Sequence, residues 1–256
     1  MKKINLLFTL LFTVITYSQM ITYTSVRLEE GQNDAYIDVE KFWSKIHEQA
    51  IKEDLETGWM IWKVIPVEGD ENAANQPDFL IMNFYQDSVQ MNKGVDFYKL
   101  GRSVYSKLSK KKFDKIWEAG PYGTRNFYQL ERLDNTTWLF GDLEIGTKLT
   151  LNAFKQTDEN YEQYEMDFYK KWHNKRILNG SRKWWELNRV LSSSENGNKE
   201  ITHVTLDMMG KELSESEREE FWKEVTFTDR MMWTNGAKTR EMINQVNLEL
   251  VMYRFK

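Results

Sequence analysis

Apolar and polar residues alternate along several short segments of the chain, and apolar residues recur at helical spacing in the stretches between them. Residues 21–28 (ITYTSVRL) alternate and are rich in β-branched residues, which is typical of a strand. Residues 35–54 place Val39, Phe42 and Ile46 at helical spacing, which is typical of a helix with one buried side. The same patterns predict strands at 21–28, 58–66, 78–86, 126–133, 147–154, 183–191, 201–209 and 246–255, and helical regions at 35–54, 88–118, 160–178 and 214–242.

The two halves of the chain repeat this order, and their sequences align without gaps at an offset of 126 residues. The seven identical pairs between residue 21 and residue 64 and their partners are Thr24/Thr150, Phe42/Phe168, Lys45/Lys171, His47/His173, Ile51/Ile177, Trp59/Trp185 and Val64/Val190. Such self-similarity indicates an internal duplication. We predict one repeat at 19–134, a second at 147–256, and a connection at 135–146 that is either a linker or an extra strand.

The residues of the first helix and of the two strands after it resemble a known superfamily. They are Phe42-Trp43-Ser44-Lys45-Ile46-His47, Gly58-Trp59 with Trp62, and Asn83-Phe84-Tyr85. Each half has the order βαββαβ of the ferredoxin-like motif. Its sheet has helices on one face only, so packing the two bare faces together would close a barrel. The chain thus resembles the dimeric α/β barrel superfamily in its tandem, fused form, and in particular its exported, uncharacterised Bacteroidetes-type members.

This resemblance implies an α+β fold in which two tandem ferredoxin-like repeats form a barrel-like pseudo-dimer. Members of the superfamily include heme-degrading monooxygenases, chlorite dismutase-like heme proteins, small-molecule isomerases and monooxygenases, and proteins with no known activity. It therefore implies a small-molecule-binding protein with its ligand in or at the barrel interior. One alternative is an enzyme, either a cofactor-free monooxygenase or isomerase or a heme-dependent one. A second is a structural or interaction module of the cell envelope.

The N-terminus has the pattern of an export signal. Lys2 and Lys3 precede an apolar stretch at 4–15, and the small Ser18 stands near a cleavage point. The apolar stretch is shorter than the roughly 20 residues that a membrane span needs. We predict that residues 1–18 are a signal peptide, cleaved near Ser18/Gln19, and that the mature protein is periplasmic or secreted, without a membrane span.

Composition excludes several kinds of chemistry. The chain of 256 residues has no Cys, which excludes disulfides, thiolate nucleophiles and Cys-ligated metals. Its net charge of -4 argues against nucleic acid as a partner. The three His residues show none of the paired spacings of a metal site. We therefore predict no metal and no cofactor, with heme as the alternative, and a small organic molecule as the partner.

The third predicted strand of each half has an apolar and a more polar face. The apolar faces, which we expect to pack on helices, hold Leu80, Met82 and Phe84 in the first half and Val204, Leu206 and Met208 in the second. The opposite faces, which we expect to line the barrel, hold Asn83, Tyr85, His203, Thr205 and Asp207. A polar interior would hold water or a ligand, unless its side chains satisfy each other across the sheets.

Two aromatic and two basic residues are further ligand-binding candidates. Trp62 and Trp184 fall on the opposite strand face from Trp59 and Trp185, which we expect in the core, so one of each pair points into the barrel. Such side chains suit a flat, apolar or sugar-like ligand. Arg125 and Arg240, at matching positions near the last strand of each half, either bind an anionic ligand at the barrel mouth or form structural ion pairs.

The repeated His47 and His173 are candidates for proton transfer or heme contact. Each lies at the edge of the buried side of its helix, so the competing interpretation is a hydrogen bond to a neighbouring loop or strand. Two charge runs, Lys107–Lys115 and Glu212–Glu220, have net charges of +4 and -4. They indicate solvated helix faces, or a contact between copies in a homo-oligomer.

Overall fold

The computed structural model describes residues 19–66, 76–120, 122–138 and 143–256, so the predicted signal peptide at 1–18 lies outside the described residues. The strands are β1 (Met20–Leu28), β2 (Gly58–Ile65), β3 (Phe79–Tyr85), β4 (Tyr122–Asn135), β5 (Lys148–Gln156), β6 (Arg182–Ser193), β7 (His203–Met209) and β8 (Arg240–Phe255). The helices are α1 (Asn33–Lys52), α2 (Ser88–Met91), α3 (Phe97–Val104), α4 (Lys110–Trp117), α5 (Tyr161–Gln163), η2 (Tyr164–Tyr169), α6 (Lys170–Leu178), α7 (Glu215–Lys223) and α8 (Phe227–Ala237). Every predicted strand and helical region is present.

The strands form one closed antiparallel barrel in the order β1-β3-β2-β8-β5-β7-β6-β4. Within it, the first half contributes β4-β1-β3-β2 and the second half β8-β5-β7-β6, the same order in both. The halves are joined by the pairing of β2 with β8 and of β4 with β6. The predicted fold class, α+β with two ferredoxin-like units in a barrel, is confirmed.

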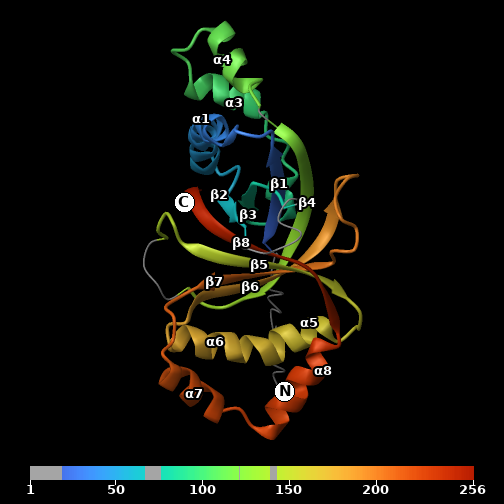
Figure 1. Ribbon diagram of the computed structural model, residues 1–256. Helices are drawn as coiled ribbons and strands as arrows, with labels where there is room; N and C mark the ends of the chain where they lie inside the picture. Colours follow the sequence, from blue (N-terminus) through green and yellow to red (C-terminus); the bar gives the residue numbers. More distant parts are fainter. Residues whose placement is uncertain (1–18, 67–75, 121, 139–142) are drawn as a thin grey trace, which may run out of the picture.

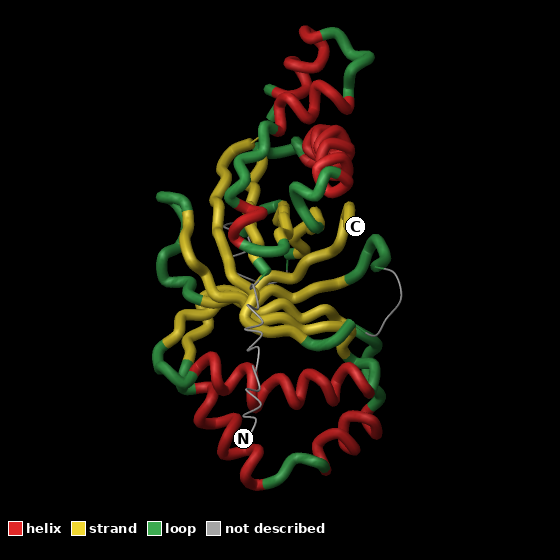
Figure 2. Tube along the Cα trace, turned by 180° about the vertical axis from the view of Figure 1, so that it is seen from behind, coloured by secondary structure: helices red, strands yellow, loops and turns green. Residues whose placement is uncertain are grey.

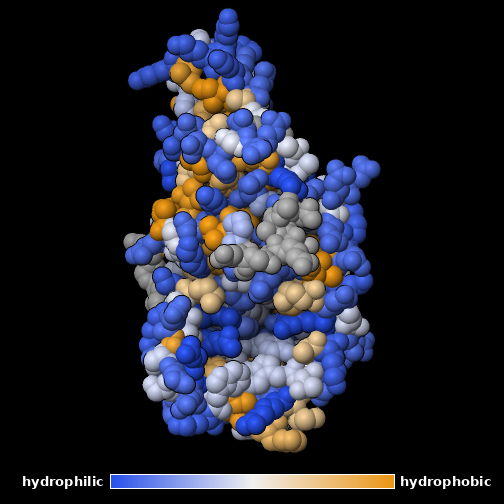
Figure 3. Space-filling view, viewed as in Figure 1, coloured by the Kyte–Doolittle hydropathy of each residue, from blue (hydrophilic) through white to orange (hydrophobic). Residues whose placement is uncertain are grey.

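Helices cover the outside of the barrel at two opposite ends of the molecule (Figure 1). Helices α1, α3 and α4 lie beyond the first-half strands, and α5 to α8 lie beyond the second-half strands, as the view from behind also shows (Figure 2). Helix α1 packs on its sheet through Tyr36, against Trp59 and Phe79. Hydrophobic side chains gather among α1, α3 and α4 at the upper end of the molecule (Figure 3), where Phe42 and Phe113 are buried.

The barrel interior is apolar, and the predicted orientation of the third strands is wrong. Its buried cluster includes Leu80, Met82, Phe84, Val204, Leu206 and Met208. The polar set of Asn83, Tyr85, His203, Thr205 and Asp207 lies on the outer faces, under the helices, because strand neighbours point to opposite sides. The physical reason is that the outer layer brings polar partners such as Glu56 and Glu162 to these side chains, whereas two sheets facing each other bring few.

The described parts of the predicted connection 135–146 contain no strand after Asn135. Within the described ranges, no helix combines the length and apolar character needed to cross a bilayer.

Candidate functional site

A cleft of about 600 Å³ lies between helix α1 and the first-half sheet, on the outside of the barrel. It is lined by Thr22, Thr24, Trp43, His47, Asn83, Tyr85, Met91, Asn92, Phe97, Phe127, Tyr128, Gln129, Ser192, Ser193 and Ser194. A smaller hollow of about 130 Å³ shares five of these residues and adds Glu40 and Arg125. The structure thus brings four predicted site residues, namely His47, Asn83, Tyr85 and Arg125, to one place that is not the barrel interior.

His47 is held rigidly in this cleft. Its Nδ1 lies 2.9 Å from Oε2 of Glu56, a carboxylate that is fully buried. Asn83 donates from Nδ2 to the other oxygen of Glu56 at 3.3 Å. The imidazole stacks on the indole of Trp59, with ring centres 5.0 Å apart and planes at 15°. The carboxylate therefore orients the ring and favours a proton on Nδ1.

That orientation determines which ring nitrogen of His47 carries the lone pair. When Nδ1–H donates to Glu56, neutral imidazole has its lone pair on Nε2. Among the described residues, no group hydrogen-bonds this nitrogen. Burial and the nearby charge of Glu56 raise the pKa of Tyr85, so its hydroxyl stays protonated as a donor. The cleft therefore combines a base and a hydrogen-bond donor among aromatic side chains.

In the second half, the equivalent histidine also stacks on a tryptophan, but its Nδ1 faces a cation instead of a carboxylate. His173 stacks on Trp185, with ring centres 4.6 Å apart and planes at 14°. Its Nδ1, however, contacts the guanidinium of Arg182, which in turn pairs with Asp207 at 2.8 Å. Because a guanidinium only donates, Nδ1 must accept and Nε2 must carry the proton. In this arrangement His173 has no free lone pair for a base.

The other outer-face candidates of the second half are also engaged in internal contacts. His203 contacts Glu162 through Nε2 at 2.9 Å and Thr202 through Nδ1 at 3.0 Å. Burial lowers the pKa of His203. Thr205 accepts from Asn152, which also donates to Asp207.

Arg240 forms an ion pair with Glu165, a buried carboxylate. Its guanidinium also lies 4.4 Å from the ring centre of Phe154. The structural interpretation of Arg240 as an ion pair, which the sequence left open, is the one that the structure supports. On the first-half side, the charge of Arg125 acts on Glu40 in the small hollow.

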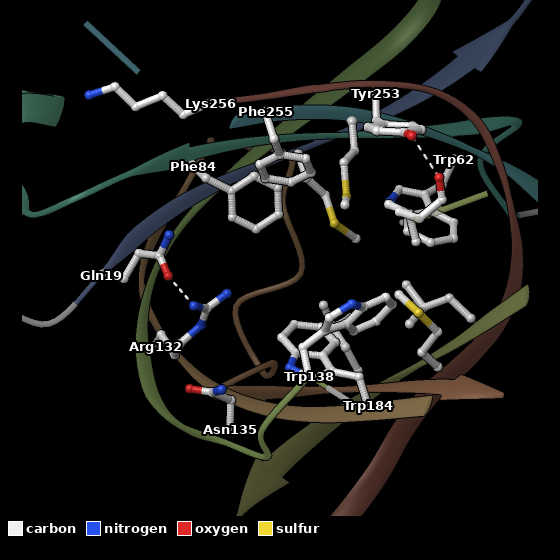
Figure 4. A pocket seen from close by; sticks show the side chains of 16 residues that line it. Gln19, Trp62, Phe84, Arg132, Asn135, Trp138, Trp184, Tyr253, Phe255 and Lys256 are labelled. Carbon is white, nitrogen blue, oxygen red and sulfur yellow. Dashed lines mark hydrogen bonds between the residues drawn. The ribbon is translucent and has the colours of Figure 1, made fainter. Parts of the chain in front are cut away.

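A separate pocket of about 630 Å³ opens from one mouth into the barrel interior. Trp62 and Trp184 line it as predicted, together with Phe84, Trp138 and Tyr253. Figure 4 shows these side chains around an open centre, with the guanidinium of Arg132 extending toward it from one side. Three methionines complete the wall, namely Met60, Met82 and Met208. The walls are mostly aromatic and sulfur-containing, which suits a flat apolar molecule.

One polar cluster interrupts the apolar interior. Arg132 forms an ion pair with Glu186, whose side chain is fully buried. Asn188, also fully buried, donates to Glu186 at 2.8 Å and contacts the hydroxyl of Tyr23 at 3.4 Å. Gln19 contacts the other side of the Arg132 guanidinium. This cluster gives the barrel a fixed cation on the wall of its larger pocket.

Comparisons with known proteins agree with this architecture. No known protein-family model and no curated protein sequence matches the chain. A solved structure of a candidate monooxygenase from Fusobacterium nucleatum is similar, with a TM-score of 0.57 at 10% identity, over 94% of this chain and 95% of that one. The chain has the dimeric α/β barrel fold. A candidate monooxygenase from Lactobacillus acidophilus has a TM-score of 0.53 at 8% identity over 93% and 96%. An anthrone oxidase-like protein reaches 0.50 at 9% over 93% of both chains.

Sequence reasoning missed the polar cluster inside this dimeric α/β barrel. Its signal was present in the predicted strand 183–191, where Trp184, Glu186 and Asn188 alternate with Trp185 and Leu187. Once Trp184 was assigned to the interior, the period of two required Glu186 and Asn188 there as well. Arg132 gave no such signal, because it stands near the end of the predicted strand 126–133.

The residues that could hold a heme or a metal are few. His47 has a carboxylate behind its Nδ1, an arrangement that suits a histidine that binds a metal through Nε2. His173 and His203 do not suit this role. Nδ1 of His173 contacts Arg182, which leaves the proton on Nε2, and both ring nitrogens of His203 have partners. Across the described ranges, no three His, Asp or Glu side chains gather in the way that a metal ion requires.

Proposed function

We propose that this chain is an exported small-molecule-binding protein that holds its ligand in the barrel interior. The observation that carries the proposal is the pocket of about 630 Å³ with Trp62 and Trp184 in its wall. A pocket of this size is within the range of small-molecule sites, which are mostly apolar with a few placed polar groups. The proposal of export is based on the sequence pattern at residues 1–18. It predicts that the mature chain starts near Gln19, which N-terminal sequencing would check.

A crystal structure of the purified protein, before and after incubation with 2-naphthol, tests the barrel site. We expect density for the flat molecule between Trp62 and Trp184. Trp184→Ala, which removes one wall, should weaken binding by at least tenfold, whereas Trp222→Ala on the exposed surface should leave it unchanged. An interior filled by side chains in both crystals would contradict this proposal and favour a structural or interaction module of the cell envelope.

The second candidate function is an enzyme that uses the first-half cleft, and the contact between His47 and Glu56 favours it. In this function, Nε2 of His47 takes a proton from a phenolic or enolisable substrate. The protonated hydroxyl of Tyr85 donates to the oxygen where negative charge develops. Such an electron-rich anion is what a cofactor-free monooxygenase or isomerase needs. Asn83 orients the base through Glu56.

Anthrone, an enolisable aromatic ketone, is a suitable probe because one structural neighbour is an anthrone oxidase-like protein. We expect dioxygen consumption that falls by roughly 100-fold in His47→Gln, the scale of a lost general base. The matched control is His173→Gln, which removes the equivalent residue of the second half and should retain the rate. Equal rates in the wild-type protein and His47→Gln would contradict the role of His47.

The heme-dependent form of this enzyme would use the same residue. Heme, when bound, would supply a redox-active iron, and Nε2 of His47 is the nitrogen available to hold it. Titration with hemin should then give a Soret band that His47→Ala loses and that His173→Ala and His203→Ala keep. A band that persists in His47→Ala would contradict this assignment.

A further inference from the structure

The barrel contains a second pocket, of about 400 Å³, on the other side of the polar cluster. Along β5, Leu149 lines the larger pocket, while Leu151 and Ala153 line the smaller one. The two pockets therefore follow each other along the strands, toward opposite mouths. Arg132 lines the larger pocket and Tyr23 the smaller one. The fully buried Glu186 and Asn188 connect these two residues across the middle of the barrel.

The larger pocket offers one cation inside the barrel and one at its mouth. Lys256 is exposed and pairs with Asp54 at 2.9 Å, whereas the side chain of Arg132 is only 20% exposed. The Arg132 guanidinium also lies 5.6 Å from the ring centre of Trp184. The guanidinium therefore lies over part of this indole, and a flat ligand stacked beside it on Trp184 would have its acid group next to Arg132. Arginine binds carboxylate, phosphate and similar oxyanion groups through two parallel hydrogen bonds, so an acid group suits the end of the ligand that faces Arg132.

The charges of Arg132 and Glu186 determine what happens when an anion enters the pocket. Arg132 and Glu186 together are neutral, so an incoming anion would leave two negative charges against one guanidinium in an apolar barrel. Unpaired charge of this kind is costly to bury. Burial already raises the pKa of Glu186, although Arg132 and Asn188 oppose the shift. Protonating Glu186 restores neutrality and lets the anion take the place of the carboxylate beside the guanidinium.

The other groups that face Glu186 do not compete for this proton. From β1, Tyr23 has its pKa raised by burial and by the charge of Glu186, so it remains a neutral hydroxyl. From β8, Tyr253 donates its hydroxyl to the carbonyl of Leu143. Among the described residues, β2, β3, β5 and β7 contribute only apolar side chains to the larger pocket.

We propose that the barrel takes an organic anion with a flat apolar body, that its acid group binds Arg132, and that Glu186 takes up one proton from solvent as the anion enters. This inference rests on the proposed function of the barrel pocket. It identifies the ligand as an aromatic or similarly flat acid and makes its binding stronger as the pH falls.

Two fluorescent probes test the inference on the full chain. 8-Anilino-1-naphthalenesulfonate is anionic at all relevant pH values, and N-phenyl-1-naphthylamine is the same ring system without the sulfonate. For the sulfonate we expect the dissociation constant to rise up to about tenfold per pH unit between pH 5 and 8, as uptake of one proton requires. For the amine we expect no such dependence. Calorimetry of the wild-type protein in two buffers of different ionisation enthalpy should count close to one proton per sulfonate bound.

Three variants complete the test. Glu186→Gln should bind the sulfonate at least tenfold more tightly at pH 8 and lose the pH dependence. Arg132→Gln should lose the sulfonate and keep the amine, while Arg230→Gln, an exposed cation on α8, should change neither. If the amine binds but the sulfonate does not, or binds without proton uptake, this inference is overturned and the barrel site stands. If Arg230→Gln loses the sulfonate and keeps the amine, the anion binds elsewhere and only this inference is overturned. If neither probe binds the wild-type protein, both proposals fail.

Discussion

At the scale of single residues, several carboxylates are buried, and their negative charges are compensated by different partners. Glu186 and Glu165 each face an arginine, and Glu56 faces His47 and Asn83. Glu40 on α1 is 2% exposed, and its Oε1 has no hydrogen-bond partner among the described residues. Burial raises the pKa of Glu40, although Tyr36, His47 and Arg125 act in the opposite direction. The negative charge of Glu40 is therefore less compensated than those of Glu56, Glu165 and Glu186.

This imbalance predicts a pH-dependent effect of Glu40→Gln. A carboxyl whose pKa is raised by folding stabilises the protein below its unfolded pKa, and this stability is lost as the pH rises through the folded pKa. The neutral amide avoids that loss, so the free energy of unfolding of Glu40→Gln should exceed that of the wild-type protein at pH 7 by roughly 1 kcal/mol. The difference should shrink toward pH 4. Urea titrations at several pH values measure it, with the exposed Glu219→Gln as the control. A Glu40→Gln protein that is less stable at pH 7 would contradict the argument.

At the scale of elements, periodicity located the strands but did not orient them. All six residues from His203 to Met208 in β7 are buried, because helices cover one face of the sheet and the opposite sheet covers the other. Alternation separates the side chains into two sets. Polarity does not then show which set faces the barrel interior, because the polar set is also buried. The orientation depends on partners such as Arg182 and Glu162, which belong to other elements and which no local pattern reveals.

Local sequence patterns were also insufficient for one helix and for the candidate site. The predicted helix 160–178 is confirmed, but its centre is the π-helix η2, for which the sequence pattern gave no indication. The cleft residues were all named from the sequence, but Asn83 and Tyr85 were expected in the barrel interior and Arg125 at its mouth. His47 was expected at the edge of the buried side of its helix, which is where it lies. What could be predicted was where each strand lies along the chain and which side chains share a face, and what could not was the layer in which each face lies.

Gly210, which follows β7, packs closely against the backbone that precedes β6, and this contact gives a prediction. At Gly210, a Cβ atom would overlap the carbonyl oxygen of Gly180 and lie 2.8 Å from the carbonyl carbon of Ser181. Backbone atoms cannot rotate away, so Gly210→Ala should force the two segments apart and cost roughly 2 kcal/mol or more in the free energy of unfolding. The control is Gly31→Ala, where φ is +77° and the space is open, so only backbone strain of about 1 kcal/mol applies. Thermal unfolding of both variants measures the difference, and equal losses would contradict the close approach.

At the scale of the whole molecule, the two halves share one interior. Their charged helices lie far apart, with α4 and its lysines at one end and α7 and its glutamates at the other (Figure 1). These runs therefore do not pair within one chain, and the contact between copies stays a prediction. The apolar interior instead joins the halves, because the cluster around Trp62, Leu80 and Leu206 takes residues from both sheets.

This shared interior predicts that neither half is stable alone. Residues 19–134 produced by themselves would expose the sheet face that carries Met60, Trp62 and Met82, together with the unpaired edges of β2 and β4. Such a face and such edges are covered either by association or by aggregation. We expect fragment 19–134 to form dimers or aggregates, and to copurify with fragment 147–256 when both are expressed, while the full chain unfolds in one transition. Sedimentation and calorimetry measure these outcomes. A stable, soluble monomer of either fragment would show that each sheet can cover its own face, and the barrel would then be a contact between two independent domains.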